Sequence, residues 1–211
     1  MAPCPTGSKQ DMIMERTVDE VVSELERQLS FFRQSGGGVT YSGGECTTQR
    51  EFLAEMVNRC YDMGLNQAIE TSGFFDFVTL RPTLEKMDLF FIDIKVMDQK
   101  KHRRYTGVSN EIILENIKKI ATFQKPMVIR IPTIVGVNAT EENVGATARF
   151  VKAHIPDPCI ELLPYHEYGE EKYDRLGLHR PDDRFGAPSE EQMALLKKVI
   201  AIEGVRNISY R

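Results

Sequence analysis

The sequence predicts an α/β fold in which helices cover a parallel sheet, and three observations carry this prediction. Strand patterns alternate with helical patterns about five times along the chain, which is typical of a parallel sheet. Residues 89–94 are nearly all apolar, as expected of a strand buried on both faces. Several helical patterns begin at capping residues. Periodicity alone leaves two architectures open, a doubly wound open sheet and a partial barrel.

Capping side chains mark where the predicted helices begin. The expected caps, in chain order, are Thr17, Thr48, Ser109, Thr140 and Ser189. Thr17 and Ser189 are each followed three residues later by Glu or Gln, which is capping-box spacing. The first helix has an apolar stripe from Val18 to Leu29 and is expected to end before Gly36, and a further short helix, without a predicted cap, is expected over residues 77–86.

Strand patterns lie between these helices and are short and rich in β-branched or aromatic residues. They cover residues 39–42, 67–71, 88–95, 127–131, 160–163 and 205–209. Residues 164–188 show no regular pattern, and loops of that length are often functional lids or binding loops.

Composition indicates an ordinary globular domain. The chain has 211 residues, of which 41% are hydrophobic and 27% are charged, so a sizeable core is expected. The formal net charge of −4 argues against nucleic acid as the main partner, because phosphate binding needs a basic face. No apolar run approaches the roughly 20 residues of a membrane span, and residues 1–10 lack the apolar core of a signal peptide. We therefore expect a cytoplasmic protein that binds neither membranes nor nucleic acid.

Cysteine positions exclude the usual metal-binding pairs. Cys4, Cys46, Cys60 and Cys159 are too far apart to form a chelating Cys-x-x-Cys motif. A disulfide framework is not expected in a chain of this length either. We expect Cys60 and Cys159 to be buried as small hydrophobic residues.

Polar or glycine residues follow five of the predicted strands. Because the carboxyl ends of parallel strands meet at one edge of a sheet, these residues should lie together. They are Ser42-Gly43-Gly44-Glu45, Glu70-Thr71-Ser72-Gly73, Asp93-Ile94-Lys95, Arg130 with Thr133, and Tyr165-His166-Glu167. The sequence thus predicts a ligand site at this edge.

The first of these groups combines bare backbone with a carboxylate. Gly43 and Gly44 permit close approach of a ligand, and a carboxylate at Glu45 suits an ammonium group. The alternative is a tight turn with a surface Glu. The earlier run Gly36-Gly37-Gly38 either cradles phosphate or is a flexible approach to the strand.

The next groups place two carboxylates at neighbouring strand ends. Glu70 and Asp93 repel each other unless a cation lies between them, and hard cations favour such oxygen ligands. The alternative is two separately solvated side chains. Lys95 shares a strand face with Asp93, so it could neutralise that residue or bind a ligand carboxylate or hydroxyl. His166 opens the pattern-free segment and is expected to face a ligand.

Taken in order, these residues resemble the radical S-adenosylmethionine superfamily, in its branch of glycyl-radical-enzyme activating enzymes such as pyruvate formate-lyase activating enzyme. The similar segments are residues 37–45, 69–73, 91–95, 130–138 and 162–166. The resemblance spans residues 17–210. It implies a partial (β/α)6 barrel of the TIM type over residues 17–211 that lacks the first strand and the cluster loop. Residues 1–16 would be a remnant of a cysteine-rich segment.

The resemblance also implies the roles of the site residues. S-adenosyl-L-methionine would be contacted by Gly43, Gly44, Glu45, Thr71, Lys95, Arg130, Thr133 and His166. Glu70 and Asp93 would bind a monovalent cation beside it. No side chain is expected to act as a catalytic acid, base or nucleophile.

The chemistry implied by the resemblance is radical formation on a partner. In the family, a reduced [4Fe-4S] cluster splits S-adenosylmethionine, and the 5′-deoxyadenosyl radical takes hydrogen from a glycine Cα of a glycyl-radical enzyme, such as pyruvate formate-lyase. Flavodoxin or ferredoxin would be the reductant of the full-length parent. The cluster requires Cys-x-x-x-Cys-x-x-Cys, and Cys4 resembles only the end of a cysteine-rich insert. We therefore expect the cluster in the full-length parent only, and an inactive chain here.

Two other functions remain open from the sequence. The chain could be a non-catalytic module that docks on a glycyl-radical enzyme. It could also be an unrelated α/β phosphate-binding enzyme that uses its glycine loops.

Overall fold

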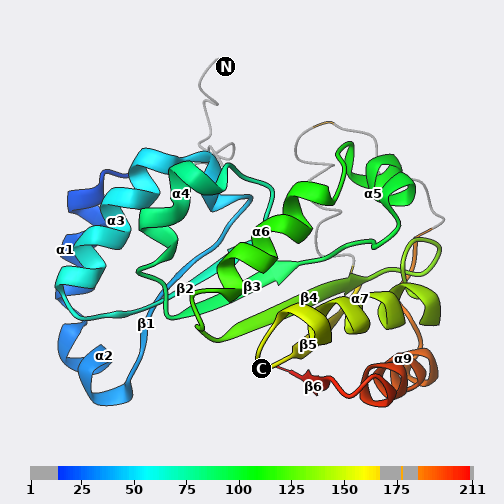
Figure 1. The fold of residues 1–211 in the computed structure, drawn as a ribbon. Helices are drawn as coiled ribbons and strands as arrows, with labels where there is room; N and C mark the ends of the chain where they lie inside the picture. The colour runs from blue at the N-terminus through cyan, green and yellow to red at the C-terminus, as the bar shows by residue number, and fades with distance from the viewer. Residues whose placement is uncertain (1–13, 167–176, 178–184, 210–211) are drawn as a thin grey trace.

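The computed structural model describes residues 14–166, 177 and 185–209. Within these residues, six strands form one sheet in the order β1-β2-β3-β4-β5-β6 (Figure 1). The strands are Gly38–Tyr41 (β1), Asn66–Thr71 (β2), Leu89–Asp93 (β3), Met127–Thr133 (β4), Cys159–Pro164 (β5) and Arg206–Ile208 (β6). Every neighbouring pair is parallel, which confirms the predicted fold class.

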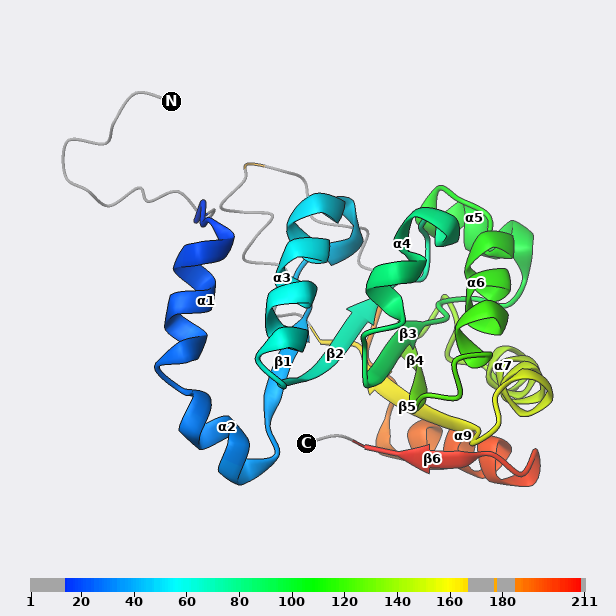
Figure 2. The same ribbon diagram turned by 60° about the vertical axis from the view of Figure 1, so that its left-hand side comes forward.

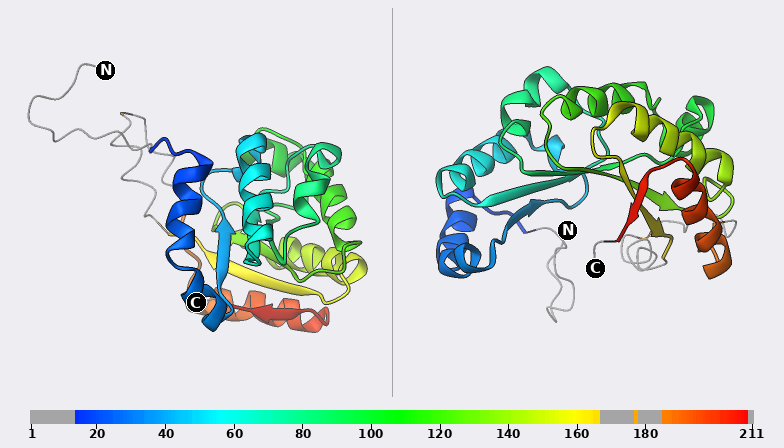
Figure 3. Two further views of the ribbon diagram at one scale, coloured as in Figure 1. Left: turned by 90° about the vertical axis from the view of Figure 1, so that its left-hand side faces the viewer. Right: turned by 60° about the horizontal axis from the view of Figure 1, so that its bottom comes forward.

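The sequential strand order decides between the two architectures that the sequence left open. A doubly wound sheet reverses its direction of growth, whereas here each strand is added beside the previous one. Right-handed crossovers then place the connecting helices on one face of the sheet. Figures 2 and 3 show the helices against one face and the sheet curving around the other, concave face. The chain is therefore a partial barrel.

The helices connect the strands along the convex face. They are Val18–Glu26 (α1), Leu29–Ser35 (α2), Arg50–Asp62 (α3), Phe77–Leu84 (α4), Gln99–Thr106 (α5), Glu111–Ala121 (α6), Glu141–His154 (α7) and Glu190–Ile202 (α9), with a 3-10 turn at Cys46–Thr48 (η1). Thr17 and Ser189 form complete capping boxes, and Thr140 caps α7, all as predicted. None of the helices in the described ranges has the length and apolar character needed to cross a bilayer.

The amino-terminal helix pattern was predicted as one helix, but the structure has two. The chain turns at Arg27 and Gln28, so that α1 ends and α2 starts before β1. Val18 and Val22 of α1 are buried, whereas α2 contains no buried residue. Helices in proteins are stabilised mainly by tertiary packing, so the apolar pattern alone could not predict this break.

Two predicted caps and one helix also needed correction. Thr48 lies in η1 rather than at a helix start, because its hydroxyl donates to the Glu45 carbonyl at 2.7 Å. Ser109 lies one residue before the actual N-cap, Asn110, whose side chain donates to the backbone of the β3–α5 connection instead. Helix α5 was not predicted, because its sequence is polar and only His102 is buried.

The two faces of the sheet carry separate apolar clusters. Alternate strand residues such as Ile69, Phe90 and Ile129 are fully buried beneath the helices in the main core. On the concave face, Phe91, Val128 and Cys159 form a second, smaller apolar cluster. The charged residues that follow along the same strands therefore lie on the concave face, above this cluster.

Candidate functional site

Side chains from four strands join at the carboxyl edge of the sheet. Ser42, just after β1, donates to Glu70 Oε2 of β2 at 2.8 Å. Glu70 Oε1 lies 2.8 Å from Arg130 Nη1 of β4, and Arg130 Nε lies 2.9 Å from Glu161 Oε2 of β5. Residues far apart in the sequence thus form one continuous chain of contacts across the concave face.

Arg130 is the centre of this chain. Its guanidinium carbon lies 3.9 Å from the centre of the Phe91 ring, so the cation rests on the apolar cluster. The side chain is 14% exposed, and that of Glu161 is 3% exposed. Burial lowers the pKa of Arg130, but its bonds to Glu70 and Glu161 outweigh burial and raise it. The guanidinium is therefore a fixed internal cation.

Glu70 is held in its ionised form by the same network. Burial raises the pKa of its carboxyl group, but hydrogen bonds from Arg130 and Ser42 outweigh that effect and lower the pKa below its ordinary value. Asp93 is paired in register with Arg130 on the adjacent strand, and its Oδ2 accepts from Lys95 Nζ at 2.9 Å. Each carboxylate of the predicted cation site thus has a protein cation as partner.

Glu45 is bonded to neighbouring groups of the chain itself. Its carboxylate accepts from the hydroxyls of Thr47, Thr71 and Ser72 at 2.8, 2.7 and 2.6 Å, and from the backbone N–H of Ser72 at 2.8 Å. Burial raises its pKa, but these bonds outweigh burial and lower it. The carboxylate is occupied by the chain itself, so it fixes the loop after β1 to the end of β2.

The glycines of that loop remain open to a ligand. A Cβ placed on Gly43 or Gly44 would meet no atom within 4 Å, and both residues are exposed. Gly43 has a φ of +111°, a conformation that favours glycine. The exposed glycine backbone expected here is therefore present, and the bonds of Glu45 to the end of β2 hold this loop in place.

A buried amide connects the next two strand ends. Asn138 is 1% exposed, and its Nδ2 donates to the carbonyls of Lys95 and Pro132, both at 2.6 Å. Its Oδ1 accepts from Ile134 N at 2.7 Å. Asn138 thereby fixes the segment carrying Lys95 against the end of β4.

Two predicted ligand contacts point away from the concave face. Thr133 is fully buried and lies on the same face of the sheet as Ile131, two residues earlier in the strand. Its hydroxyl donates to the Ile131 carbonyl at 2.8 Å. Thr71 is 6% exposed and acts through Glu45. The sequence pattern does not show on which face of the sheet a strand-end residue lies, so Thr133 and Thr71 were both predicted to contact the ligand. His166 comes directly after β5 at the same edge and is exposed.

The charges at this edge do not balance. Among six side chains, four are carboxylates and two are cations, so their formal net charge is −2; they are Glu45, Glu70, Asp93, Glu161, Lys95 and Arg130. In the part of the chain that the structure describes, no cluster of three or more His, Cys, Asp or Glu side chains is placed to hold a metal ion. These six side chains, taken by themselves, favour a ligand group with positive charge.

Sequence reasoning missed Glu161 as a site residue. Glu161 had a signal, because it is a carboxylate within the otherwise apolar strand Cys159–Pro164. A buried charge in such a strand requires a partner, and that requirement points to Arg130 on the neighbouring strand. Ser72 was among the expected strand-end residues, but its contact with Glu45 could not be predicted because it depends on where Glu45 lies.

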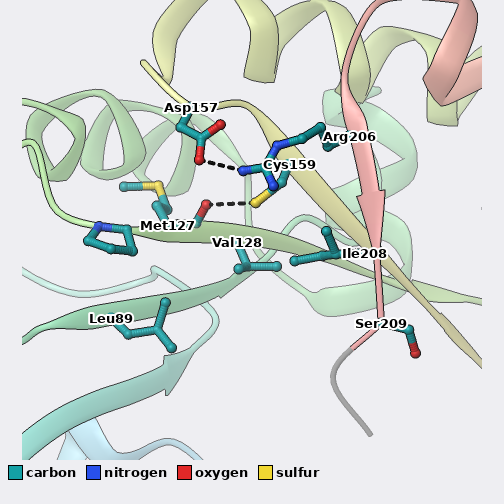
Figure 4. A pocket seen from close by; sticks show the side chains of 9 residues that line it. Leu89, Met127, Val128, Asp157, Cys159, Arg206, Ile208 and Ser209 are labelled. Carbon is teal, nitrogen blue, oxygen red and sulfur yellow. Dashed lines mark hydrogen bonds and ion pairs between the residues drawn. The ribbon is translucent and has the colours of Figure 1, made fainter.

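The opposite, amino edge of the sheet contains a separate hollow. It has a volume of about 150 Å3 and is bordered by the ion pair Asp157–Arg206 and by Cys159, whose thiol donates to the Met127 carbonyl at 3.2 Å (Figure 4). Gly38 of β1 borders a second hollow at this edge, and a Cβ there would come within 1.9 Å of Asn66 O. Gly38 thus serves close strand packing and Gly36 ends α2 in a left-handed conformation, both at the end of the sheet opposite the charged site.

Comparisons with known proteins place the chain in a family. A solved domain of pyruvate-formate lyase-activating enzyme from Bacteroides vulgatus is 33% identical, with a TM-score of 0.67, over 82% of this chain and 98% of that domain. The trans-4-hydroxy-L-proline dehydratase activating enzyme of Clostridioides difficile is 37% identical over 88% of this chain and 62% of its own length. The 4-hydroxyphenylacetate decarboxylase activating enzyme of Clostridium scatologenes is 36% identical, over 93% and 63%. No family model matches the chain.

The fold is thus shared with a solved domain of a pyruvate-formate lyase-activating enzyme. The chain belongs to the radical S-adenosylmethionine family of glycyl-radical-enzyme activating enzymes. It spans about three-fifths of the length of the curated relatives that it matches, 62% and 63%.

Proposed function

We propose that this chain is the S-adenosylmethionine-binding barrel of an activase that forms a glycyl radical on a partner enzyme. The convergence of Ser42, Glu70, Arg130 and Glu161 on one concave edge, beside the open backbone of Gly43, carries this proposal. S-adenosylmethionine fits such an edge, because its sulfonium and ammonium groups outweigh its single carboxylate. When bound, together with a [4Fe-4S] cluster, it supplies the radical chemistry that removes hydrogen from a glycine Cα.

The chain's own residues would orient the cofactor and exclude water. The backbone of Gly43 and Gly44 would accept the amino group, and Glu45 would hold that loop in position. Lys95, whose side chain is 41% exposed, would reach a carboxylate or hydroxyl of the ligand. His166 would border the cofactor at the end of β5.

Arg130, Glu70 and Asp93 would tune the charge of the edge. Arg130 contributes a fixed positive charge near the ligand while its guanidinium stays bound to two carboxylates. A monovalent cation between Glu70 and Asp93 remains part of the proposal. It would have to replace their contacts with Arg130 and Lys95.

The cysteines of the described residues do not fit a cluster. Cys60 and Cys159 are buried in different apolar clusters on the two faces of the sheet. Cys46 is half-buried, and burial together with the Glu45 carboxylate raises the pKa of its thiol to about 11. Thiolates are what an iron–sulfur cluster requires. We therefore propose that the chain by itself does not carry out the radical reaction.

The partner and the reductant belong to the same proposal. The relatives are named for activating a dehydratase and a decarboxylase, so the proposed partner is a glycyl-radical enzyme in the manner of pyruvate formate-lyase. Flavodoxin or ferredoxin would reduce the cluster in a cluster-carrying parent. The cysteine positions also favour the second candidate, a module that docks on this partner without activating it.

Cofactor binding can be tested with two ligands that differ in charge. We expect S-adenosylmethionine to bind more tightly than S-adenosylhomocysteine, which lacks the sulfonium charge, in isothermal titration at low salt. Affinity should be weaker than micromolar without a cluster. Amide resonances of Gly43 and Gly44 should shift on binding. Gly44→Val should weaken binding because it fills the open backbone approach, whereas Ser30→Val on the exposed face of α2 should not.

Three results would contradict this account. Equal affinity for the two ligands would remove the charge argument. Resonance shifts confined to the amino edge would place the ligand elsewhere. Strong [4Fe-4S] absorbance after anaerobic reconstitution, with cleavage of S-adenosylmethionine, would show that the chain is active by itself. A glycyl-radical enzyme that binds the chain without turnover would favour the docking module.

A further inference from the structure

Helix α5 presents an unbalanced positive surface at the rim of the site. It follows β3 at the carboxyl edge of the sheet (Figure 1). Four of its eight residues are exposed cations and none is acidic; the cations are Lys100, Lys101, Arg103 and Arg104. In the described ranges, no carboxylate lies within ion-pair distance of any of them.

Only two of the four cations suit the helix. Arg103 and Arg104 lie in the last turn, where the helix dipole favours cations. Lys100 and Lys101 lie in the first turn, where the dipole is positive and disfavours them. Lys100 and Arg104 are also four residues apart on the same face, so they repel each other. Helix stability therefore does not explain the two lysines at the start of α5.

Contacts on the inner side hold the helix in a fixed position. His102 is 2% exposed, and its Nδ1 lies 2.8 Å from the Val108 carbonyl. Asp98 caps the first turn by accepting from Lys101 N at 2.7 Å. The Tyr105 hydroxyl donates to Gly136 O of the connection after β4 at 3.4 Å. The cations are thus displayed on a scaffold that is connected to two strand ends of the site.

Exposed apolar residues also lie in segments that follow strand ends at this edge. Phe74, Val78 and Ile112 are 41%, 78% and 49% exposed, and they belong to the β2–α4 connection, the start of α4 and the start of α6. Asn116 of α6 donates to Gly73 O at 2.9 Å, so the first and last of these segments pack together. Apolar anchors interleaved with arginines are typical of protein interfaces.

We propose that α5, together with Phe74, Val78 and Ile112, forms a docking surface for an acidic patch on the glycyl-radical enzyme. This inference rests on the function proposed above. A chain of net charge −4 repels an acidic partner overall, so a local basic helix would set the orientation of approach. Its place at the rim would bring the docked partner to the mouth of the site.

Photo-crosslinking in the source organism tests where the partner lies. p-Benzoylphenylalanine is placed at Lys101 on α5, at Gln49 on the rim near Glu45, and at Lys197 on α9 as a control; all three residues are exposed. We expect position 101 to capture a glycyl-radical enzyme through an acidic segment, identified by mass spectrometry of the linked peptides. Position 197 should not capture it.

Binding of the captured enzyme then measures the charge contribution. K101E/R104E and the control K197E/K198E change the net charge of the chain by the same amount. We expect the dissociation constant to rise on the order of tenfold for the α5 variant and to change little for the control. The difference should shrink as added salt screens the charges. Equal weakening in both variants would overturn the docking surface, as would no weakening in either.

The crosslinking outcomes separate the two proposals. Capture of a glycyl-radical enzyme at position 49 but not at 101 would overturn the docking surface and leave the proposed function intact. Capture at 101 of only another class of protein, or of nucleic acid, would overturn the docking surface and count against the proposed function. No capture at 101 or 49 would count against both.

Discussion

Replacing Arg130 by Met should strongly destabilise the fold, because the two carboxylates that pair with Arg130 would lose their cation. Methionine is a flexible apolar side chain that can keep contact with the Phe91 ring. The substitution removes the cation between Glu70 and Glu161. Since Glu161 is 3% exposed, its carboxylate would then lose the buried guanidinium that balances its charge.

The magnitude follows from the exposure of the two carboxylates. Removing one partner of a buried ion pair costs about 3–5 kcal/mol. The pair with Glu70, which is 35% exposed, adds less than about 1 kcal/mol because water screens it. We expect Arg130→Met to lower the free energy of unfolding by about 3–6 kcal/mol.

The companion variant replaces both deeply placed members. In Arg130→Met/Glu161→Leu no buried charge is left, so the loss should fall to about 1 kcal/mol or less. The matched control is Arg149→Met, because Arg149 is 61% exposed in its pair with Glu203 and that pair contributes about 0–1 kcal/mol. Urea unfolding at pH 7, followed by far-ultraviolet circular dichroism, gives all three values.

Two outcomes would refute this reasoning. A loss below about 1 kcal/mol for Arg130→Met would mean that water reaches Glu161. A double variant as unstable as the single one would mean that side-chain shape, and not the uncompensated charge, determines the loss.

Three further predictions concern the loops around the site. Burial raises the pKa of Glu45, but its hydrogen bonds hold that pKa below the ordinary value, so its stabilisation is present at pH 7 and is lost as the pH falls through the folded pKa. Glu45→Gln should therefore reduce stability at pH 7, and its difference from the wild type should narrow as a urea series is taken from pH 7 to acid; a difference that does not change with pH would contradict this. Asn138→Ala should cost about 3 kcal/mol in the same assay, since it leaves three buried backbone groups unpaired; a loss below about 1 kcal/mol would contradict this. Gly38→Ala should disrupt the β1–β2 pairing, because its Cβ would overlap Asn66 O, and amide exchange in β1 should accelerate, whereas Gly44→Ala, which meets no atom, should leave exchange unchanged.

The carboxyl-edge site was predictable from the sequence in outline because strand ends collect there in any parallel sheet. Chain order and strand signals were enough to expect Gly43, Glu70, Asp93 and Arg130 on one edge. They were not enough to assign each side chain to a face of the sheet. Side chains alternate between the two faces along a strand, and the sequence does not show where each strand stops alternating. Thr133 was therefore assigned to the ligand although it points into the main core.

The sequence by itself determined the alternation of strands and helices, the parallel sheet and the family, because these depend on local periodicity and on the order of motifs. Only the tertiary structure decided that Glu45 binds the end of β2, that Asn138 binds the segment carrying Lys95, and that Glu161 anchors Arg130. The physical reason is that these three properties depend on contacts between residues distant in the chain. The sequence identifies a carboxylate but does not show whether it contacts a ligand, a serine or a buried arginine.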